Sequence, residues 1–376
     1  MASSAESLEP TVPFNDLSRT PPELAAQIAD AVARVVASGW YVLGPEHDAF
    51  EAELAAYVGS AHAVALANGT DALELSLSAI GVGPGDTVMT VANAGGYASV
   101  AARLLGAEPV YADVSPETLL LSVETATAAL DAQPTPPKAL VVTHLYGAMA
   151  PAAELVDLAH SRGIAVVEDV AQAIGARAGG RPAGTFGDIG TTSFYPTKNL
   201  GALGDGGAVF TSNAELATAV RSLRQYGWTS KYRIGRARGR NSRLDELQAA
   251  ILRVKLPYLD AMNERRRAIH SRYEQASSEA LRIVNRSSES FIGHLAVGVA
   301  ADRDAARAAL DAAGIRTDVH YPIPDHRQDW PAPTGLGLPA TEAASASVLS
   351  LPMFPELTDA EVDRVVAALR TIGGAA

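Results

Sequence analysis

Short apolar segments alternate with helical patterns along the first part of the chain, and this alternation limits the possible folds more than any other feature. Strands are expected at residues 61–67, 87–92, 108–114, 138–145 and 163–170. Helices are expected between them, at residues 72–80, 97–106 and 151–163. Because the strands are apolar on both faces, they are typical of a mostly parallel sheet that lies between helices. The pattern therefore predicts an α/β domain.

The pattern changes in the last third of the chain. Residues 241–276 are expected to form one long helical stretch, with Pro257 as a kink. Shorter strand and helix patterns follow from about residue 280. We therefore expect an N-terminal segment and a large α/β domain over residues 1–250. A linking helix and a small C-terminal α+β domain are expected over residues 251–376.

Composition excludes several classes of protein. The 376 residues include no cysteine, which excludes disulfides and thiolate metal sites, and the scattered histidines predict no metal site. A net charge of −12 argues against nucleic-acid binding, which requires basic surface. There is no apolar segment of about 18 residues that would span a membrane. The start, MASSAESLEP, lacks the features of a secretory signal, so we expect a cytoplasmic protein.

Two ionisable residues stand in unusual surroundings. Asp169 closes the apolar strand in GIAVVEDV, and ligands bind at the carboxyl edge of such sheets. Taken alone, such an aspartate is more often a cap on the next helix than a ligand partner. Lys198 lies among small and apolar residues in SFYPTKNLGALGDGG. A lone lysine is usually a surface residue, but a desolvated amine has a lowered pKa and attacks carbonyl groups.

A third feature, a strand end followed by a helix start, suggests one ligand for both Asp169 and Lys198. At Asn68-Gly69-Thr70 a strand ends and a helix begins, and free backbone N–H groups at a helix start suit a phosphate group. Ser193 adds a second hydroxyl close to Lys198 in the sequence. Pyridoxal phosphate requires a lysine, an acidic partner for its ring nitrogen and a phosphate cradle. Together these residues predict a pyridoxal-phosphate enzyme.

The glycine-rich stretches do not match the common nucleotide-binding or hydrolase motifs. The chain has no G-x-x-x-x-G-K-[ST] run and no G-x-S-x-G elbow, and GALGDGG lacks the strand and helix of a dinucleotide fingerprint. The segment KYRIGRARGRNSR (231–243) carries six positive charges and no acid. It is either a solvated loop or a site that attracts anions.

Many ordered stretches resemble the nucleotide-sugar aminotransferases of the DegT/DnrJ group, which have the aspartate-aminotransferase-like type I fold. The resemblance extends from about VPFNDL (12–17) to LSLPMFPELT (349–358). It includes GWYVLGPEHDAFE, ANGTDAL, VVEDVAQAIGA, TTSFYPTKNLGALGDGGAVFT, GRNSRLDELQAAIL and IRTDVHYPIPDHRQ. One departure is AMAPAAEL after HLYG, which lacks an acidic residue that the family usually has there.

The resemblance implies a role for each matching residue. Lys198 is implied to carry the cofactor and move a proton, and Asp169 to pair with the ring nitrogen. Gln172 lies beside the cofactor hydroxyl and Tyr97 stacks on the ring. The phosphate contacts are Gly69, Thr70, Ser193 and, from the neighbouring subunit, Asn241. The implied substrate contacts are Lys231, Arg233, Arg236, Arg238 and Arg240 at a diphosphate, and His320, Tyr321 and His326 at the sugar.

The resemblance also implies a reaction and its partners. L-Glutamate is the expected amino donor, and a keto-deoxysugar linked to a nucleotide, with dTDP favoured, is the expected acceptor in amino-sugar and antibiotic biosynthesis. A homodimer with shared active sites is implied. The stretch NAGGY (93–97) resembles members that aminate carbon 3 of the sugar. Two alternatives remain open, namely a keto-cyclitol acceptor and a catalytically silent regulatory or binding homologue.

Overall fold

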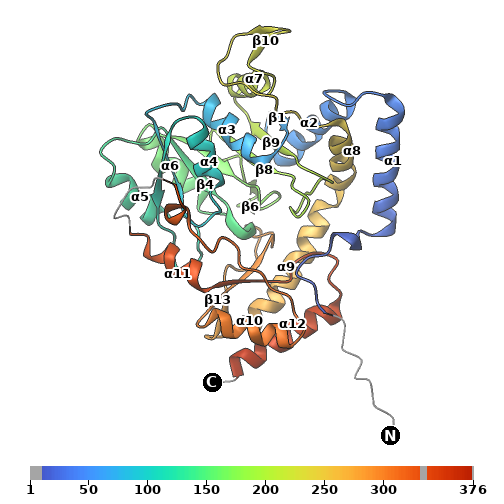
Figure 1. The fold of residues 1–376 in the computed structure, drawn as a ribbon, viewed down its shortest axis with the longest axis vertical. Helices are drawn as coiled ribbons and strands as arrows, with labels where there is room; N and C mark the ends of the chain where they lie inside the picture. Colours follow the sequence, from blue (N-terminus) through green and yellow to red (C-terminus); the bar gives the residue numbers. More distant parts are fainter. Residues whose placement is uncertain (1–10, 331–336, 375–376) are drawn as a thin grey trace.

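The computed structural model describes residues 11–330 and 337–374, so the initial segment MASSAESLEP lies outside the described residues. Its centre is a seven-stranded sheet in the order β1-β9-β8-β5-β4-β2-β3 (Figure 1). The strands are β1 (His62–Leu66), β2 (Thr87–Val91), β3 (Glu108–Ala112), β4 (Ala139–Thr143), β5 (Ala165–Asp169), β8 (Ile189–Ser193) and β9 (Gly207–Thr211). The mostly parallel sheet that the sequence predicts is confirmed.

Strand direction decides where the site is built. Strand β9 is antiparallel to both β1 and β8, whereas β8, β5, β4, β2 and β3 are parallel to one another. Within the described residues, β9 is thus the one strand of this sheet that runs the other way. The carboxyl ends of β1, β5 and β8 therefore meet at one edge, which is where ligands bind in open α/β sheets.

Helices cover both faces of the large sheet. One face packs against α3 (Gly69–Ala79), α4 (Tyr97–Leu104) and α7 (Ala214–Leu223). The other packs against α2 (Pro45–Val58), α5 (Val123–Asp131), α6 (Ala152–Ser161) and α8 (Glu246–Lys255). Successive residues of β4 point to opposite faces of the sheet and are apolar on both. Val141 packs in the core on the side of α3, and its neighbours Leu140 and Val142 pack in the core on the side of α5 and α6.

The long helical stretch is interrupted as expected at Pro257. After α8 the chain makes the 3₁₀ turn η3 (Leu256–Tyr258) and continues as α9 (Leu259–Gln275). The expected start at residue 241 is wrong, since α8 begins at Glu246 and Asn241 forms a β-bridge with Gln225.

The chain ends in a smaller α+β unit, drawn in the lower part of Figure 1. Its antiparallel sheet contains β12 (Leu281–Ile283), β13 (Ala296–Ala300) and β14 (Val348–Leu351). Helices α9, α10 (Arg303–Ala312) and α12 (Asp359–Gly374) share a core with it, and α11 (Pro339–Ser347) precedes β14. We propose a division into two domains near residue 250, which falls within α8.

The remaining elements lie around these two sheets. Helix α1 (Pro22–Ser38) packs on α8, and the hairpin of β10 (Trp228–Ser230) and β11 (Arg233–Ile234) protrudes at the top of Figure 1. The short pieces are β6 (Arg177–Ala178), β7 (Arg181–Pro182), η1 (Leu17–Arg19), η2 (Leu145–Gly147) and η4 (Asp325–Arg327). No helix in the described part of the chain has the length and apolar character to cross a membrane.

Candidate active site

A cavity of about 460 Å³ lies at the carboxyl edge of the large sheet, where the smaller unit approaches it. Its walls contain most of the residues that the sequence singled out. They are Gly69, Thr70, Tyr97, Asp169, Gln172, Ser193, Lys198, His320 and Tyr321. The topology explains why residues so far apart in sequence meet here. Asn68 follows β1, Asp169 ends β5 and Ser193 ends β8, and these strands run in the same direction.

Lys198 and Asp169 form the electrostatic centre of the cavity. Burial lowers the pKa of the Lys198 amine to about 8, although the charge of Asp169 raises it. Burial also raises the pKa of Asp169, against the opposite effects of the Ala171 N–H and the charge of Lys198. The Ala171 N–H donates to Asp169 Oδ1 at 3.0 Å, and Oδ2 has no partner among the described residues. One carboxylate oxygen is therefore free to meet a protonated nitrogen.

The start of α3 and the end of β8 form a cradle beside this pair. The Asn68 side chain caps the helix by accepting from the Asp71 N–H at 2.8 Å. Gly69 passes so close to Ser193 that a Cβ atom on Gly69 would lie 2.6 Å from the Ser193 Cβ. Glycine is therefore required for the helix N-terminus and the serine hydroxyl to meet. Free N–H groups beside a hydroxyl suit a phosphate group.

Gln172 links the two units across the cavity. Its Oε1 accepts from the Tyr146 N–H at 2.7 Å, and its Nε2 donates to the Tyr321 hydroxyl at 2.8 Å. The Tyr97 ring meets the Tyr321 ring edge to face, with 6.4 Å between centroids. Both Tyr146 (φ 61) and Tyr321 (φ 59) have left-handed backbones, which are uncommon for such residues and concentrate at functional sites.

A buried hydrogen bond between His144 and Glu168 lies behind Asp169. His144 Nδ1 accepts from the Ala150 N–H at 3.1 Å, so Nε2 carries the proton and donates to Glu168 Oε2 at 3.0 Å. The N–H groups of Gly184 and Gly187 also donate to Glu168. Burial alone would raise the pKa of Glu168, but His144 and these backbone groups lower it overall. The residue that precedes Asp169 is thereby fixed.

The other predicted residues lie outside this cavity. His326 is buried, with Nε2 3.0 Å from Glu342 Oε1, and packs near Tyr111. Asn241 is exposed at the base of the hairpin. Of the basic segment, Arg238 donates to the Val82 carbonyl oxygen at 2.8 Å, and Arg240 pairs with Asp71 and Glu74. Lys231, Arg233 and Arg236 are exposed, as is Arg238 in spite of its hydrogen bond.

The cavity also contains residues that the sequence analysis did not select. Tyr195 and Thr197 flank Lys198 in SFYPTK, so their place in that motif was an available signal. Asp205, in the glycine-rich stretch that follows, also lines the wall. His294 comes from the loop before β13, and no local pattern marks it.

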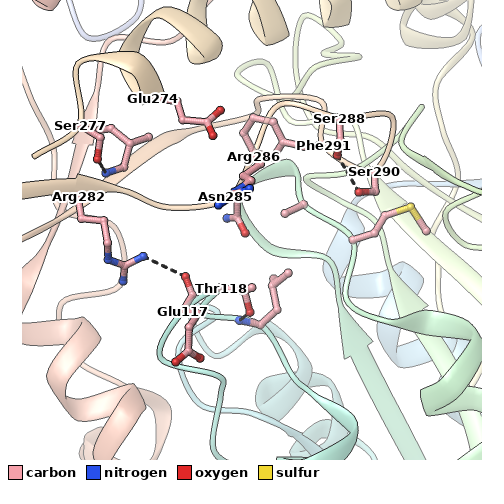
Figure 2. Close-up of a pocket in the computed structure, with 14 residues that line it drawn as sticks. Glu117, Thr118, Glu274, Ser277, Arg282, Asn285, Arg286, Ser288, Ser290 and Phe291 are labelled. Atoms are coloured by element: carbon pink, nitrogen blue, oxygen red, sulfur yellow. Dashed lines mark hydrogen bonds between the residues drawn. The ribbon is translucent and has the colours of Figure 1, made fainter.

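A second cavity, of about 590 Å³, opens between the smaller unit and the loop after β3 (Figure 2). Arg282 lies at its edge and donates to the carbonyl oxygens of Pro116 and Glu117, each at 3.1 Å. In the described part of the chain, none of the predicted site residues lines this second cavity.

A buried lysine, a buried carboxylate and a helix N-terminus beside them are the groups that a pyridoxal-phosphate site requires. The donor set in the first cavity fits this cofactor, with one amine, one carboxylate oxygen without a partner among the described residues and one phosphate cradle.

The sequence pattern of the DegT/DnrJ/EryC1/StrS aminotransferase family matches residues 22–370, and the chain belongs to this family. It is therefore a pyridoxal-phosphate-dependent aminotransferase.

Among the curated relatives is the erythromycin biosynthesis sensory transduction protein EryC1 of Saccharopolyspora erythraea, with 43% identity over 96% of this chain and 99% of the relative. A dTDP-3-amino-3,4,6-trideoxy-alpha-D-glucose transaminase of Streptomyces venezuelae is 41% identical over 98% of each chain. The crystal structure of S. venezuelae DesV in complex with a ketimine intermediate superposes with a TM-score of 0.93. It is 40% identical, and the match covers 98% of this chain and all of DesV.

Proposed function

We propose that the protein transfers an amino group from L-glutamate to a keto-deoxysugar linked to dTDP, at carbon 3, in amino-sugar and antibiotic biosynthesis. The name of the S. venezuelae relative and the similarity to DesV support this acceptor class. The observation that carries the proposal is the meeting of Lys198 and Asp169 in one cavity with a phosphate cradle. We place the activity in the cytoplasm, in keeping with a chain that lacks cysteine.

The site residues divide the work of holding the cofactor. Gly69, Thr70 and Ser193 would hold its phosphate, Tyr97 would cover its ring, and Asp169 would meet its ring nitrogen. When bound, pyridoxal phosphate supplies an electron sink for the electrons left behind when a carbon-bound proton is removed. A charged Asp169 would keep the ring nitrogen protonated, and the Glu168–His144 hydrogen bond holds the residue that precedes Asp169.

Lys198 is suited to moving that proton. With a pKa of about 8, part of its amine is uncharged at neutral pH and can accept a proton, which it can return at another carbon. Because the amine is desolvated, loss of its charge requires less free energy than in water. The charge of Asp169 limits how far the pKa of Lys198 falls. Tyr321 and His320 also line the cavity, where they would orient the sugar, and Gln172 would lie beside the cofactor hydroxyl.

We further propose a homodimer in which each subunit completes the other's site. Asn241 does not line its own cavity, although its expected role is a phosphate contact. Large apolar side chains are also exposed on the loop after α1, on the loop between β8 and β9, and on the hairpin. They include Trp40, Tyr41, Leu203, Tyr232 and Ile234. Exposed apolar surface of this extent marks an interaction site, and a second copy of the chain is the proposed partner.

The first experiment tests the lysine. The purified protein is expected to show a visible absorption band that L-glutamate removes, and Lys198→Ala should lose both the band and turnover. Lys255→Ala is the matched control, because Lys255 is another partly buried amine whose pKa burial lowers, and it lies outside the cavity. Turnover by Lys198→Ala would refute the assignment.

A second experiment tests the acceptor. Arg233→Glu with Arg236→Glu reverses two exposed charges of the basic segment, and Arg307→Glu on α10 serves as the control. For a diphosphate-bearing acceptor, the KM should rise at least roughly tenfold in the double variant alone. An unchanged KM would favour a keto-cyclitol, which has no diphosphate. Arg238 and Arg240 are not used, because they already have partners within the chain.

A regulatory role is the second candidate, and the name of the S. erythraea relative, a sensory transduction protein, is the observation that favours it. The presence of Lys198, Asp169 and the phosphate cradle favours a catalytic role over a regulatory one. A protein that binds the cofactor but does not react with L-glutamate or any other amino donor would support the regulatory role instead.

A further inference from the structure

A third cavity, of about 60 Å³, shares Lys198 with the active-site cavity. Its walls include the segment before α1, the loop that carries Lys198, parts of α8 and α9, and the loop after β14. This volume holds a few water molecules or one small ion. We call it the arginine cavity, because Arg266 of α9 lines it and is the residue that requires an explanation.

Arg266 is a buried cation whose hydrogen-bond donors are not used. Only 7% of this residue is exposed. Its Nε and Nη1 atoms are buried and have no hydrogen-bond partner among the described residues. Burial lowers the pKa of Arg266 to about 10, although the charge of Glu356 raises it. A buried guanidinium is costly unless acceptors reach it, so we expect an acceptor that does not belong to the described chain.

The arginine cavity has more cations than carboxylates in its walls. Lys198, Lys255 and Arg266 line it, against Asp16 and Glu356. Asp16 already forms an ion pair, at 3.0 Å, with an arginine of η1. Among the described residues Glu356 forms no ion pair, so its charge attracts Arg266 and Lys255 only from a distance. Lys255 already donates to a backbone carbonyl oxygen. The excess of positive charge favours an anion over a neutral ligand.

We propose that the arginine cavity binds one small monovalent anion of the halide class, which Arg266 holds through charge-assisted hydrogen bonds. A halide accepts from several donors at once and needs no donor of its own. A singly charged ion also loses less hydration energy on burial than a multiply charged one. Because Lys198 lines the same cavity, the anion would favour the ammonium form of this amine. The inference goes beyond the proposed function, since the anion takes no part in the transfer of the amino group.

The first test is a crystal structure of the cofactor-loaded enzyme grown in sodium bromide, because the anomalous scattering of bromide identifies this ion. One bromide ion is expected in the arginine cavity, at hydrogen-bonding distance from Arg266. A cavity that holds only water overturns the inference. Turnover by Lys198→Ala would instead refute the proposed function, and the bromide result does not depend on turnover.

Binding in solution is measured from the broadening of the chloride-35 NMR signal, at constant ionic strength with gluconate as the replacement anion. Arg266→Met removes the guanidinium but keeps a long unbranched side chain, and the affinity for chloride should fall at least roughly tenfold. Arg265→Met is the matched control, because Arg265 precedes Arg266 in α9, pairs with Asp359 at 2.8 Å and does not line the cavity. Equal chloride affinity in Arg266→Met and the unaltered enzyme overturns the inference.

A second variant decides the question if Arg266→Met does not fold. Glu356→Gln removes the carboxylate of the cavity that has no ion pair among the described residues, so the affinity for chloride should rise about tenfold. Asp304→Asn, at a side chain that is 92% exposed, should not change it. An unchanged affinity in Glu356→Gln overturns the inference. Chloride binding in Glu356→Gln alone overturns it as well, since Glu356 would then be the counter-ion of Arg266 in the unaltered enzyme.

The effect on Lys198 is measured in enzyme loaded with pyridoxamine phosphate, which leaves the lysine amine free. The rate of acetylation of Lys198 by acetic anhydride is followed by mass spectrometry across pH. Replacing gluconate by chloride should raise the pKa of Lys198 by about one unit, and Arg266→Met should abolish this response. The other titratable groups that act on Lys198 or respond to its charge, namely Asp169, His294 and His320, are the same in both salts. A Lys198 pKa that does not respond to chloride overturns the inferred effect on the lysine.

Discussion

Replacing Asp325 with asparagine should stabilise the protein, by an amount that depends on pH. Only 2% of this aspartate is exposed. The Ser99 hydroxyl donates to its Oδ2 at 2.7 Å, and its Oδ1 has no hydrogen-bond partner among the described residues. Burial raises the pKa of Asp325 from 3.8 to about 6, although the hydrogen bond from Ser99 lowers it. The charged form is therefore disfavoured in the folded protein.

The size of the effect follows from this shift. A difference of about two pKa units corresponds to about 3 kcal/mol at roughly 1.36 kcal/mol per unit. Below pH 3.8 Asp325 is protonated in both the folded and the unfolded chain, so the shift costs nothing. As the pH rises from 3.8 to about 6, the unfolded chain loses its proton first and the folded state loses stability. Above about pH 6 the full cost remains, and asparagine removes it.

The assay is urea unfolding of the cofactor-loaded enzyme at about pH 4 and about pH 7. The gain in unfolding free energy from Asp325→Asn should be larger at the higher pH than at the lower by up to about 3 kcal/mol. Asp304→Asn is the control, because 92% of the Asp304 side chain is exposed. An equal gain at both pH values would refute the reasoning, since it would show that burial does not perturb the ionisation of Asp325.

Three further substitutions test other parts of the site. Gly69→Ala should weaken cofactor binding at least tenfold, measured by titration of the visible band, because the new Cβ would lie 2.6 Å from the Ser193 Cβ. Glu168→Gln should lower the unfolding free energy by about 3 kcal/mol, since the amide nitrogen would face an N–H donor that the buried carboxylate now accepts, and unchanged urea unfolding would contradict this. Tyr321→Phe removes the hydrogen bond from Gln172 and should cost about 1 kcal/mol of stability while raising the KM of the sugar more than that of L-glutamate.

The sequence predicts that Asp169, Ser193 and Gly69 meet, because all three stand at the ends of strands. Asp169 and Ser193 are each the last residue of a buried strand, and Gly69 begins a helix directly after one. Such boundaries leave a local pattern of apolar residues followed by turn or cap residues. Once these strands share one direction, the residues at their carboxyl ends must meet at one edge. A local sequence pattern at a strand end is therefore enough to predict where its residues lie in the folded chain.

Other residues are placed by contacts that leave no local pattern. Arg240 lies in a segment that reads as uniformly basic, yet its partners Asp71 and Glu74 belong to α3, far away in the sequence. His294 likewise lines the cavity with its ring bonded to Asn199, which in turn donates to Asn263. These contacts arise when α3, the hairpin and the smaller unit come together, so a single sequence does not reveal them.

The reversed strand β9 explains why the lysine belongs to the same site as the phosphate cradle. Strand β8 ends at the carboxyl edge, and an antiparallel β9 must begin at that edge, so the loop between Ser193 and Gly207 cannot leave it. Lys198 is carried on this loop. A parallel β9 would need a crossover connection to the opposite edge, and the amine would be carried away from Asp169. Gly207 also passes directly against the backbone of Asn68 and Gly69, where any side chain would collide with it. Gly207 therefore joins the end of the lysine loop to the start of α3, and a side chain at this position should disturb the amine and the cradle together.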